Sequence, residues 1–217
     1  MRNVVIIAAL LFNAMQVTGQ QSPDDALRES ADTAAAAAPW SGSAAAYYYM
    51  LPEEKNTTTL FLYADFNSIH MEARYNYEDE QTVSLFGGYR FETGNELLFG
   101  ATPLIGIVLG NTNAIAPGLE IDLAWKMFDF YTENEYIFDF KGSENNYFYS
   151  WSELAITPFN NFRTGIAADR TRLFQSDLEL QRGIFAQYSI WKLTTGIHYF
   201  NPFADEYFLI GTLAIDF

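Results

Sequence analysis

Apolar and polar residues alternate along most of this chain with a period of two, which is typical of β-strands. Residues 206–217 show the pattern well, because every second position from Tyr207 to Phe217 is apolar or glycine. Turn signals separate such runs at short intervals. The pattern predicts strands at residues 43–51, 57–66, 69–78, 82–92, 96–109, 113–125, 128–140, 146–157, 161–172, 178–190, 193–201 and 206–217.

The connections between these runs alternate between tight and longer ones. Asn67-Ser68, Lys126-Met127 and Trp191-Lys192 leave room for two-residue turns, whereas residues 52–56 and 141–145 form longer loops. This alternation favours an even number of antiparallel strands with both ends on one side. The sequence therefore predicts an all-β chain of about twelve strands. Ten is the alternative, because Ala-Ala-Ala-Tyr-Tyr-Tyr within 43–51 has no clean face.

The beginning of the chain predicts a signal peptide. A short basic start precedes a run at residues 4–15 that is apolar except for Asn13, and this run is too short to span a bilayer. We expect cleavage near Gly19, which gives a signal peptide at 1–19, a mobile periplasmic N-terminal segment at 20–42 and a barrel at 43–217. An N-terminal membrane anchor is the alternative. No later segment is apolar enough for a membrane helix, so only a closed barrel could make the mature chain integral to a membrane.

An alternating last strand that ends in Phe217, in a chain with a secretory start, resembles bacterial outer-membrane β-barrel proteins. The resemblance implies a transmembrane, antiparallel, up-and-down β-barrel in the outer membrane of a Gram-negative bacterium. It also implies that Phe217 is the assembly signal read by the barrel-assembly machinery, and that outer-membrane lipids and lipopolysaccharide surround the protein. A soluble β-sandwich alternates in the same way and is the alternative fold.

Composition narrows the possible partners. The chain contains 19 Phe and 14 Tyr, residues that are abundant where a barrel meets the two membrane–water interfaces. It has no cysteine, which excludes disulfides and cysteine metal sites. The net charge of -15 argues against nucleic acid as a partner, because binding to phosphates requires clustered Lys and Arg.

Charged residues on alternating strands must face the barrel interior, because lipid does not accept them. A two-residue turn at Asn67-Ser68 places Asp65 opposite His70, and the following hairpin is expected to place Arg90 level with His70. Arg163 is expected further round the barrel, diagonal to Glu153. The predicted mixed cluster in the lumen comprises Asp65, His70, Glu72, Arg74, Arg90 and Arg163.

A second group of inward residues is acidic. A turn at Lys126-Met127 places Glu120 opposite Glu133, and the next hairpin is expected to place Glu153 opposite Glu133. Like charges in a row need water, a cation or arginine partners to relieve their repulsion. The predicted acidic row comprises Glu120, Glu133, Glu153, Glu135 and Asp122.

An acidic wall facing one with Arg74 and Arg90 resembles the transverse field of a porin constriction. We therefore expect a narrow channel for small hydrophilic solutes, with a bias toward cations. The alternative is a closed structural barrel filled by an internal salt-bridge network, because a barrel of about eight strands is filled by side chains and only much wider ones leave an open channel.

A lipid-modifying enzyme of the outer membrane, a hydrolase or an acyltransferase, is the second alternative. It would need a hydroxyl nucleophile within reach of a histidine. Ser189 shares a hairpin with His198 but lies roughly 13 Å away along the strands, whereas Ser150 and Ser152 lie on a strand that does not neighbour His198. The sequence predicts no catalytic residue, metal site or cofactor.

Two arginines are expected on the outer face near the external end of their strand. Arg170 and Arg172 could bind lipopolysaccharide phosphates through charge-assisted hydrogen bonds. Snorkelling of both side chains to the interface, without a specific ligand, is the simpler interpretation.

Overall fold

The computed structural model describes residues 40–52, 55–170, 180–204 and 206–217. The expected signal peptide and residues 20–39 of the expected N-terminal segment lie outside this part of the chain. The strands are β1 (Trp40–Met50), β2 (Thr57–Phe66), β3 (Ile69–Tyr75), β4 (Val83–Tyr89), β5 (Phe91–Gly94), β6 (Leu97–Leu109), β7 (Ala114–Trp125), β8 (Phe128–Asp139), β9 (Tyr147–Phe159), β10 (Phe162–Arg170), β11 (Gln181–Ile190), β12 (Leu193–Phe200) and β13 (Phe208–Asp216). Among the described residues, no helix is long and apolar enough to cross a bilayer.

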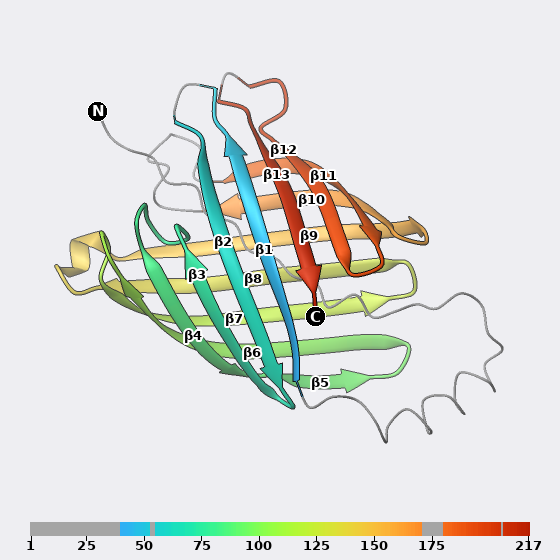
Figure 1. Cartoon of the computed structure of the whole chain (residues 1–217), viewed down its shortest axis with the longest axis horizontal. Coiled ribbons are helices and arrows are strands. Elements are labelled where there is room, and N and C mark those ends of the chain that lie inside the picture. Colours follow the sequence, from blue (N-terminus) through green and yellow to red (C-terminus); the bar gives the residue numbers. More distant parts are fainter. Residues whose placement is uncertain (1–39, 53–54, 171–179, 205) are drawn as a thin grey trace.

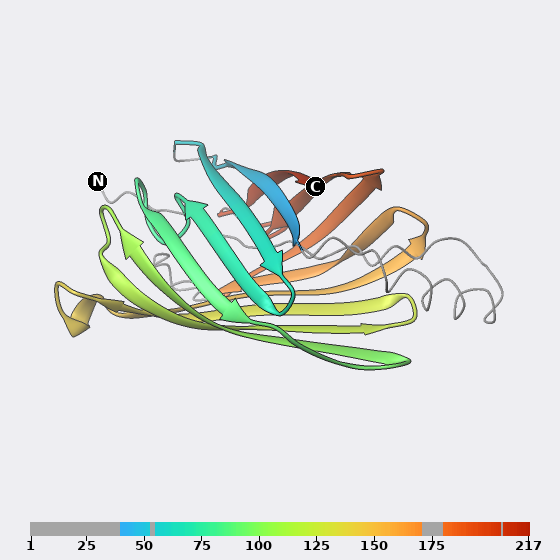
Figure 2. The same ribbon diagram turned by 60° about the horizontal axis from the view of Figure 1, so that its bottom comes forward.

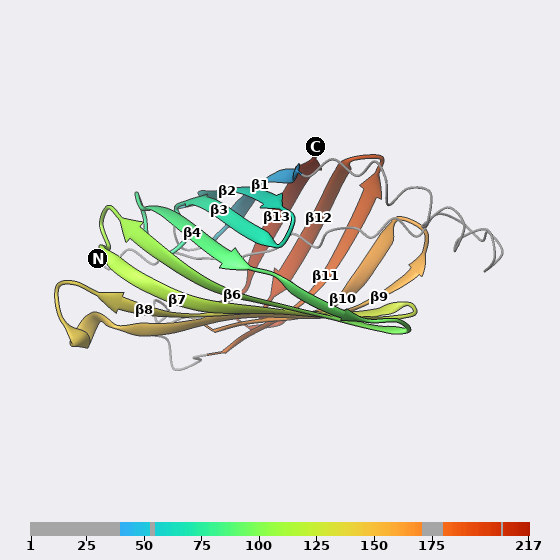
Figure 3. The same ribbon diagram turned by 90° about the horizontal axis from the view of Figure 1, so that it is seen from below.

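The strands form one closed sheet. Neighbours along the chain pair antiparallel, and β1 also pairs with β13. β4 and β5 are two parts of one strand, because both pair with β6 and only Arg90 separates them. Counted in this way, the sheet is a barrel of twelve strands, which confirms the predicted fold and excludes a two-sheet sandwich. Figure 1 shows β1 between β2 and β13, and Figures 2 and 3 show the sheet curving round an interior.

The first strand begins earlier than expected, at Trp40 instead of residue 43. Trp40 pairs with Phe66 at the start of the β1–β2 ladder. Gly42 and Phe217 exchange two backbone hydrogen bonds, with N–O distances of 3.2 and 2.9 Å. These bonds extend the contact between β1 and β13 and bring residues 40–42 into the barrel.

Side chains alternate between a polar or aromatic inner face and an apolar outer face. In β9, Tyr149, Trp151 and Glu153 are buried, whereas Phe148 and Leu154 on either side of this run are exposed. The run in β1 that showed no clean face in the sequence alternates in the same way. The buried residues of that run are Ala45, Tyr47 and Tyr49, and Tyr48 is exposed.

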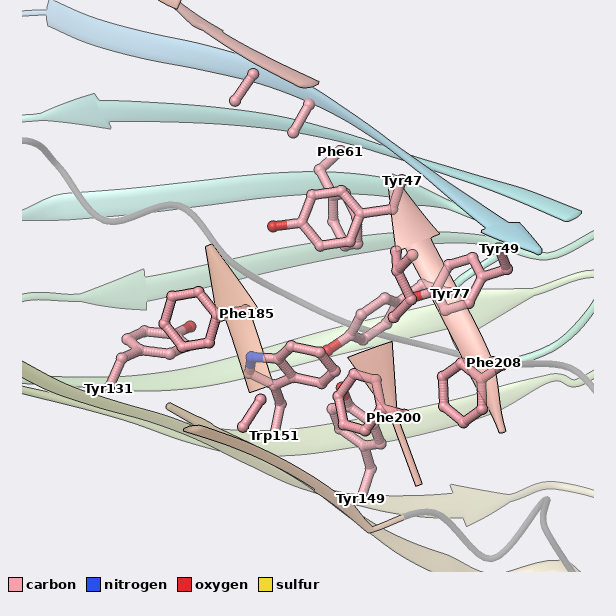
Figure 4. Packing of buried hydrophobic residues seen from close by; sticks show 14 of the residues in the cluster. Tyr47, Tyr49, Phe61, Tyr77, Tyr131, Tyr149, Trp151, Phe185, Phe200 and Phe208 are labelled. Carbon is pink, nitrogen blue, oxygen red and sulfur yellow. The ribbon is translucent and has the colours of Figure 1, made fainter. Parts of the chain in front are cut away.

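Aromatic rings fill much of the barrel interior (Figure 4). Phe200 stacks on Phe208 with ring centroids 4.9 Å apart, and Trp151 contacts Phe200 at 5.3 Å. Such offset and edge contacts contribute beyond their buried area. The labelled members of this cluster in Figure 4 are Tyr47, Tyr49, Phe61, Tyr77, Tyr131, Tyr149, Trp151, Phe185, Phe200 and Phe208.

The register between β8 and β9 differs from the prediction by two residues. Glu133 lies opposite Trp151, and Glu153 lies opposite Tyr131. The strands end earlier than expected because the connection contains a 3-10 turn, η1 (Ser143–Asn145), and because the Asn146 side chain accepts a hydrogen bond from the Asp139 N–H at 2.9 Å. A longer connection shifts every pair in the hairpin.

The register between β3 and β4 is shifted for the same reason. His70 lies opposite Gly88, so Arg90 is not level with it, and the Arg90 N–H donates to the carbonyl of Ser68 at 2.8 Å instead. The connection runs from residue 76 to residue 82 and is closed by a hydrogen bond from the Asn76 N–H to the Thr82 carbonyl.

Replacing Gly165 with alanine is expected to lower the free energy of unfolding by about 1–3 kcal/mol. A Cβ at Gly165 in β10 would lie 2.1 Å from the Leu154 carbonyl oxygen and 2.7 Å from the Ala155 Cα. Both atoms belong to the paired backbone of β9, so relief would require the strands to separate. Urea-induced unfolding of the refolded barrel, followed by tryptophan fluorescence, measures the change.

Gly87→Ala is the matched control for this substitution, because a Cβ there meets nothing within 4 Å. We expect its unfolding free energy to stay within about 0.5 kcal/mol of the wild type. Equal unfolding midpoints for the two variants would contradict the close approach at Gly165.

Candidate functional site

Arg74 is the centre of a charged network in the barrel interior. It projects inward from β3 and is 2 % exposed. Its guanidinium lies over the rings of Tyr77 and Phe86, at 4.3 and 4.2 Å from their centroids. Cation–π contacts with two rings hold the planar group in one orientation.

The carboxylates around Arg74 come from both sides of the interior. Glu72, on the same strand, lies 2.6 Å from Nη2. Glu133 lies 2.8 Å from Nη2, and Glu135 lies 2.6 Å from Nη1. Both belong to β8, and β4, β6 and β7 separate that strand from β3 along the sheet. Arg74 therefore bridges the interior.

Tyrosine hydroxyls donate further hydrogen bonds to these acidic residues. Tyr77 donates to Glu133 Oε1 at 2.8 Å, and Tyr131 donates to Glu120 Oε1 at 2.8 Å. The Tyr131 hydroxyl also lies 3.4 Å from Glu133 Oε2. Glu120 and Glu133 are opposite each other in the β7–β8 ladder, as the turn at residues 126–127 predicted. Tyr131 thus lies between two carboxylates that would otherwise repel each other directly.

His70 extends the network toward the β2–β3 turn. Its Nδ1 lies 2.7 Å from Asp65 Oδ1, in the predicted register, and its Nε2 lies 3.2 Å from Glu72 Oε1. The structure thus joins Asp65, His70, Glu72 and Arg74 in one cluster. Arg90 does not share in these contacts; its Nε lies 3.8 Å from Glu92 Oε1.

Glu78 lies in the connection after β3 and folds back over the end of this network. Its carboxylate accepts a hydrogen bond from the Ser84 hydroxyl at 2.6 Å, and its carbonyl accepts one from the Tyr147 hydroxyl at 2.8 Å. Burial raises the pKa of Glu78 to about 7, although Arg74 and the Ser84 hydroxyl act in the opposite direction.

A second network surrounds Arg163 in β10. Nη1 lies 2.6 Å from Glu153 Oε2, and Nη2 lies 2.5 Å from Asp129 Oδ1. The other oxygen of Glu153 lies 2.8 Å from His198 Nε2. The His198 ring stacks on Phe185, with centroids 5.0 Å apart. Glu153 therefore belongs to this network and not to a row with Glu133.

The acidic row is therefore divided. Glu120, Glu133 and Glu135 belong to the Arg74 network, and Asp122 follows Glu120 on the same face of β7. Sequence reasoning missed Tyr131 and Asp129 as members of these networks. Alternation could have found both, because they lie on the same face of β8 as Glu133.

The serines considered for catalysis do not approach a histidine. Ser150 and Ser152 lie between the buried residues of β9, on its outer face. Their hydroxyls lie within hydrogen-bonding distance of Asn134 and Thr132, respectively. Ser189 lies opposite Thr194. Among the described residues, no Ser–His pair suited to acyl transfer is formed.

The two outer arginines fall at the edge of the described chain. Arg170 is exposed at the end of β10, and its guanidinium lies 5.7 Å from the ring centroid of Phe148. Arg172 lies outside the described residues.

The barrel is similar in fold to solved structures of porins. The KdgM porin matches with a TM-score of 0.61 at 11% identity, over 81% of this chain and 99% of that chain. The KdgM porin in complex with disordered oligogalacturonate gives 0.62 at 10% identity, with coverages of 81% and 99%. The NanC porin gives 0.52 at 12% identity, with coverages of 81% and 98%.

The chain shares its barrel fold with these porins. No protein-family model matches its sequence, and no curated protein sequence matches it. At this level of identity, the similarity concerns the fold alone, and function must be argued from the chain's own residues.

Proposed function

We propose that this protein is an outer-membrane channel for small hydrophilic solutes, with a preference for cations. The observation that carries the proposal is a closed twelve-strand barrel whose inner face holds buried charged groups and whose outer face is apolar. An apolar outer band with a polar interior is the arrangement of transmembrane barrels. The shared fold with the KdgM and NanC porins supports it.

The charge of the interior supports the cation preference. Inward carboxylates outnumber inward arginines, and rings of acidic side chains favour cations in a pore. The inward carboxylates are Asp65, Glu72, Glu120, Asp122, Asp129, Glu133, Glu135, Glu153 and Asp169, against Arg74, Arg90 and Arg163. Oligogalacturonate, present in one KdgM complex, is a chain of acidic sugars. Because the acidic interior of this barrel would repel such a ligand, we propose neutral or cationic solutes for this chain.

The surroundings of the barrel follow from the same proposal. The apolar outer face fits contact with outer-membrane lipid. We propose in addition that the chain is exported by a cleaved signal peptide in a Gram-negative bacterium and that the barrel-assembly machinery recognises Phe217. Arg170 and Arg172 are the candidates for contact with lipopolysaccharide phosphates, and the exposure of Arg170 supports its part in this.

A closed structural barrel is the second candidate. Arg74 on β3 reaches Glu133 and Glu135 on β8, and these bonds cross the interior. A barrel whose interior is blocked by such a network would have a structural role in the membrane and would conduct no solute.

Single-channel conductance of the refolded protein in a planar bilayer distinguishes the two candidates. We expect steady conductance with cation selectivity that falls in Glu133→Gln, because this substitution removes a charge from the interior. Glu96→Gln is the control, since Glu96 is exposed in the β5–β6 turn. A correctly folded but silent wild-type barrel would overturn the channel proposal in favour of the structural one.

A further inference from the structure

Three ligand-type side chains from distant parts of the sequence meet inside the barrel. His70 and Glu72 project from β3 and Glu120 projects from β7, and one ligand atom of each lies within 4.8 Å of the other two. Each residue is 4% exposed. β4 and β6 separate the two strands along the sheet, so the cluster is formed only when the barrel closes.

Asp65 orients the histidine of this cluster. Its Oδ1 lies 2.7 Å from His70 Nδ1, so the proton of the neutral imidazole is held on Nδ1. The lone pair of Nε2 then points toward Glu72. Histidines that bind metals usually donate their other ring N–H to a carboxylate in this way, which fixes the tautomer and strengthens the ligand.

Two polar atoms of the cluster are buried without a hydrogen-bond partner. They are His70 Nε2 and Glu72 Oε1, which lie 3.2 Å from each other, and neither forms a hydrogen bond with any other group. A lone pair facing a carboxylate oxygen at this distance, away from water, is unfavourable unless a positive charge lies beside both.

We propose that His70, Glu72 and Glu120 bind a divalent transition-metal ion, with Zn²⁺ the ion that best fits them. One imidazole nitrogen and two carboxylate oxygens are ordinary zinc ligands, and a fourth position is left for water. Ligand atoms at about 2.0–2.1 Å from a tetrahedral ion lie about 3.3–3.5 Å from one another. The cluster needs only a small contraction to reach this spacing. Ca²⁺ and Mg²⁺ prefer six or more oxygens and fit less well.

The competing arrangement is a proton in place of the metal. A doubly protonated His70 between Asp65 and Glu72 would satisfy both ring nitrogens as an ion pair. It adds no hydrogen bond to Glu120 beyond that from the Tyr131 hydroxyl, whereas a metal ion would contact all three side chains.

Zinc titration of the refolded, metal-free barrel by isothermal calorimetry tests the proposal. We expect one bound Zn²⁺ per chain, and at least a tenfold loss of affinity in His70→Gln and in Glu120→Gln. Asp65→Asn is expected to weaken binding by about 10–100-fold, because it removes the group that orients the imidazole.

His198→Gln is the matched control, since His198 is also buried and lies 2.8 Å from a carboxylate. Both oxygens of that carboxylate are already bound, one by His198 and one by Arg163. We expect its zinc affinity to equal that of the wild type. Absence of binding to the folded wild type, or equal losses in His198→Gln and His70→Gln, would overturn the site.

Visible absorption of the wild type loaded with Co²⁺ provides a second readout that needs no variant. A tetrahedral site gives intense bands, whereas ions held loosely in water give weak ones, and the weak spectrum would contradict the proposed coordination. Neither measurement depends on conductance, so the metal site can be confirmed or rejected whether or not the barrel is a channel.

Discussion

Arg74→Met is expected to lower the free energy of unfolding of the refolded barrel by about 3–5 kcal/mol. The guanidinium is surrounded by Glu72, Glu133 and Glu135, each within 2.8 Å of it, and all four side chains are buried. Methionine has a similar length and no charge. The substitution therefore leaves three neighbouring carboxylates without their shared cation, and the penalty for buried unpaired charge dominates.

Urea-induced unfolding in detergent micelles or vesicles measures this change. Adding Glu135→Gln to Arg74→Met should recover part of the loss, since it removes one of the uncompensated charges, and the double-mutant cycle isolates that coupling. Lys141→Met provides a control, because Lys141 is exposed in the β8–β9 connection and its loss should change stability by no more than about 0.5 kcal/mol. If Arg74→Met and Lys141→Met unfold at the same urea concentration, the network does not hold the barrel together.

Leu154→Arg is expected to lower the unfolding free energy by about 2–4 kcal/mol when the barrel is folded into a bilayer. Leu154 is 51% exposed on the outer face, near the middle of β9. In the proposed membrane setting this position meets hydrocarbon, where a guanidinium lacks both water and a counter-ion. The same barrel in a bilayer and in a detergent of low aggregation number should differ, since the micelle lets water approach the charge.

Met127→Arg is the matched control for the outer face. Met127 is 45% exposed, close to Leu154 in exposure, but it lies in the two-residue turn between β7 and β8. At the membrane edge an arginine costs only about 0–1 kcal/mol. Similar losses for the two variants would contradict a hydrocarbon layer around the middle of the strands.

Strand number and most pairings could be predicted from the sequence because tight turns fix the register. A two-residue turn leaves one way to pair the flanking residues, so Phe66 with Ile69 and Trp125 with Phe128 followed directly. Longer connections do not have this property. The loops at 76–82 and 140–146 are wider than the sequence suggested, and each moves its hairpin by two residues.

A shift of two residues keeps every side chain on its face and changes only its height in the barrel. For this reason Glu153 was correctly placed inside the barrel and near Arg163, but its predicted position opposite Glu133 was wrong. Its partners are Arg163 and His198, and the latter lies on β12, which no local pairing rule connects with β9.

Contacts across the interior are the part that the sequence could not supply. Alternation shows that Arg74 and Glu135 both face inward, but their distance depends on the width and tilt of the closed barrel. The same holds for His70 and Glu120, which explains why no metal site was predicted from sequence spacing. A metal-binding motif can be recognised from the sequence when all its ligands share one strand or turn. Here the proposed ligands are divided between β3 and β7.

The seam between β1 and β13 also sets the order in which the barrel can fold. It joins opposite ends of the described chain, so the entropy lost on closing the ring falls on a single late step. Before that step, the edges of β1 and β13 carry unpaired amide and carbonyl groups, and a hydrocarbon environment offers them no substitute. A sheet that lacks the β1–β13 pairing is therefore much less stable than the closed barrel, because both of its edges stay unpaired. We expect closure to be all-or-none and folding to be slow, as in other proteins dominated by contacts between distant residues.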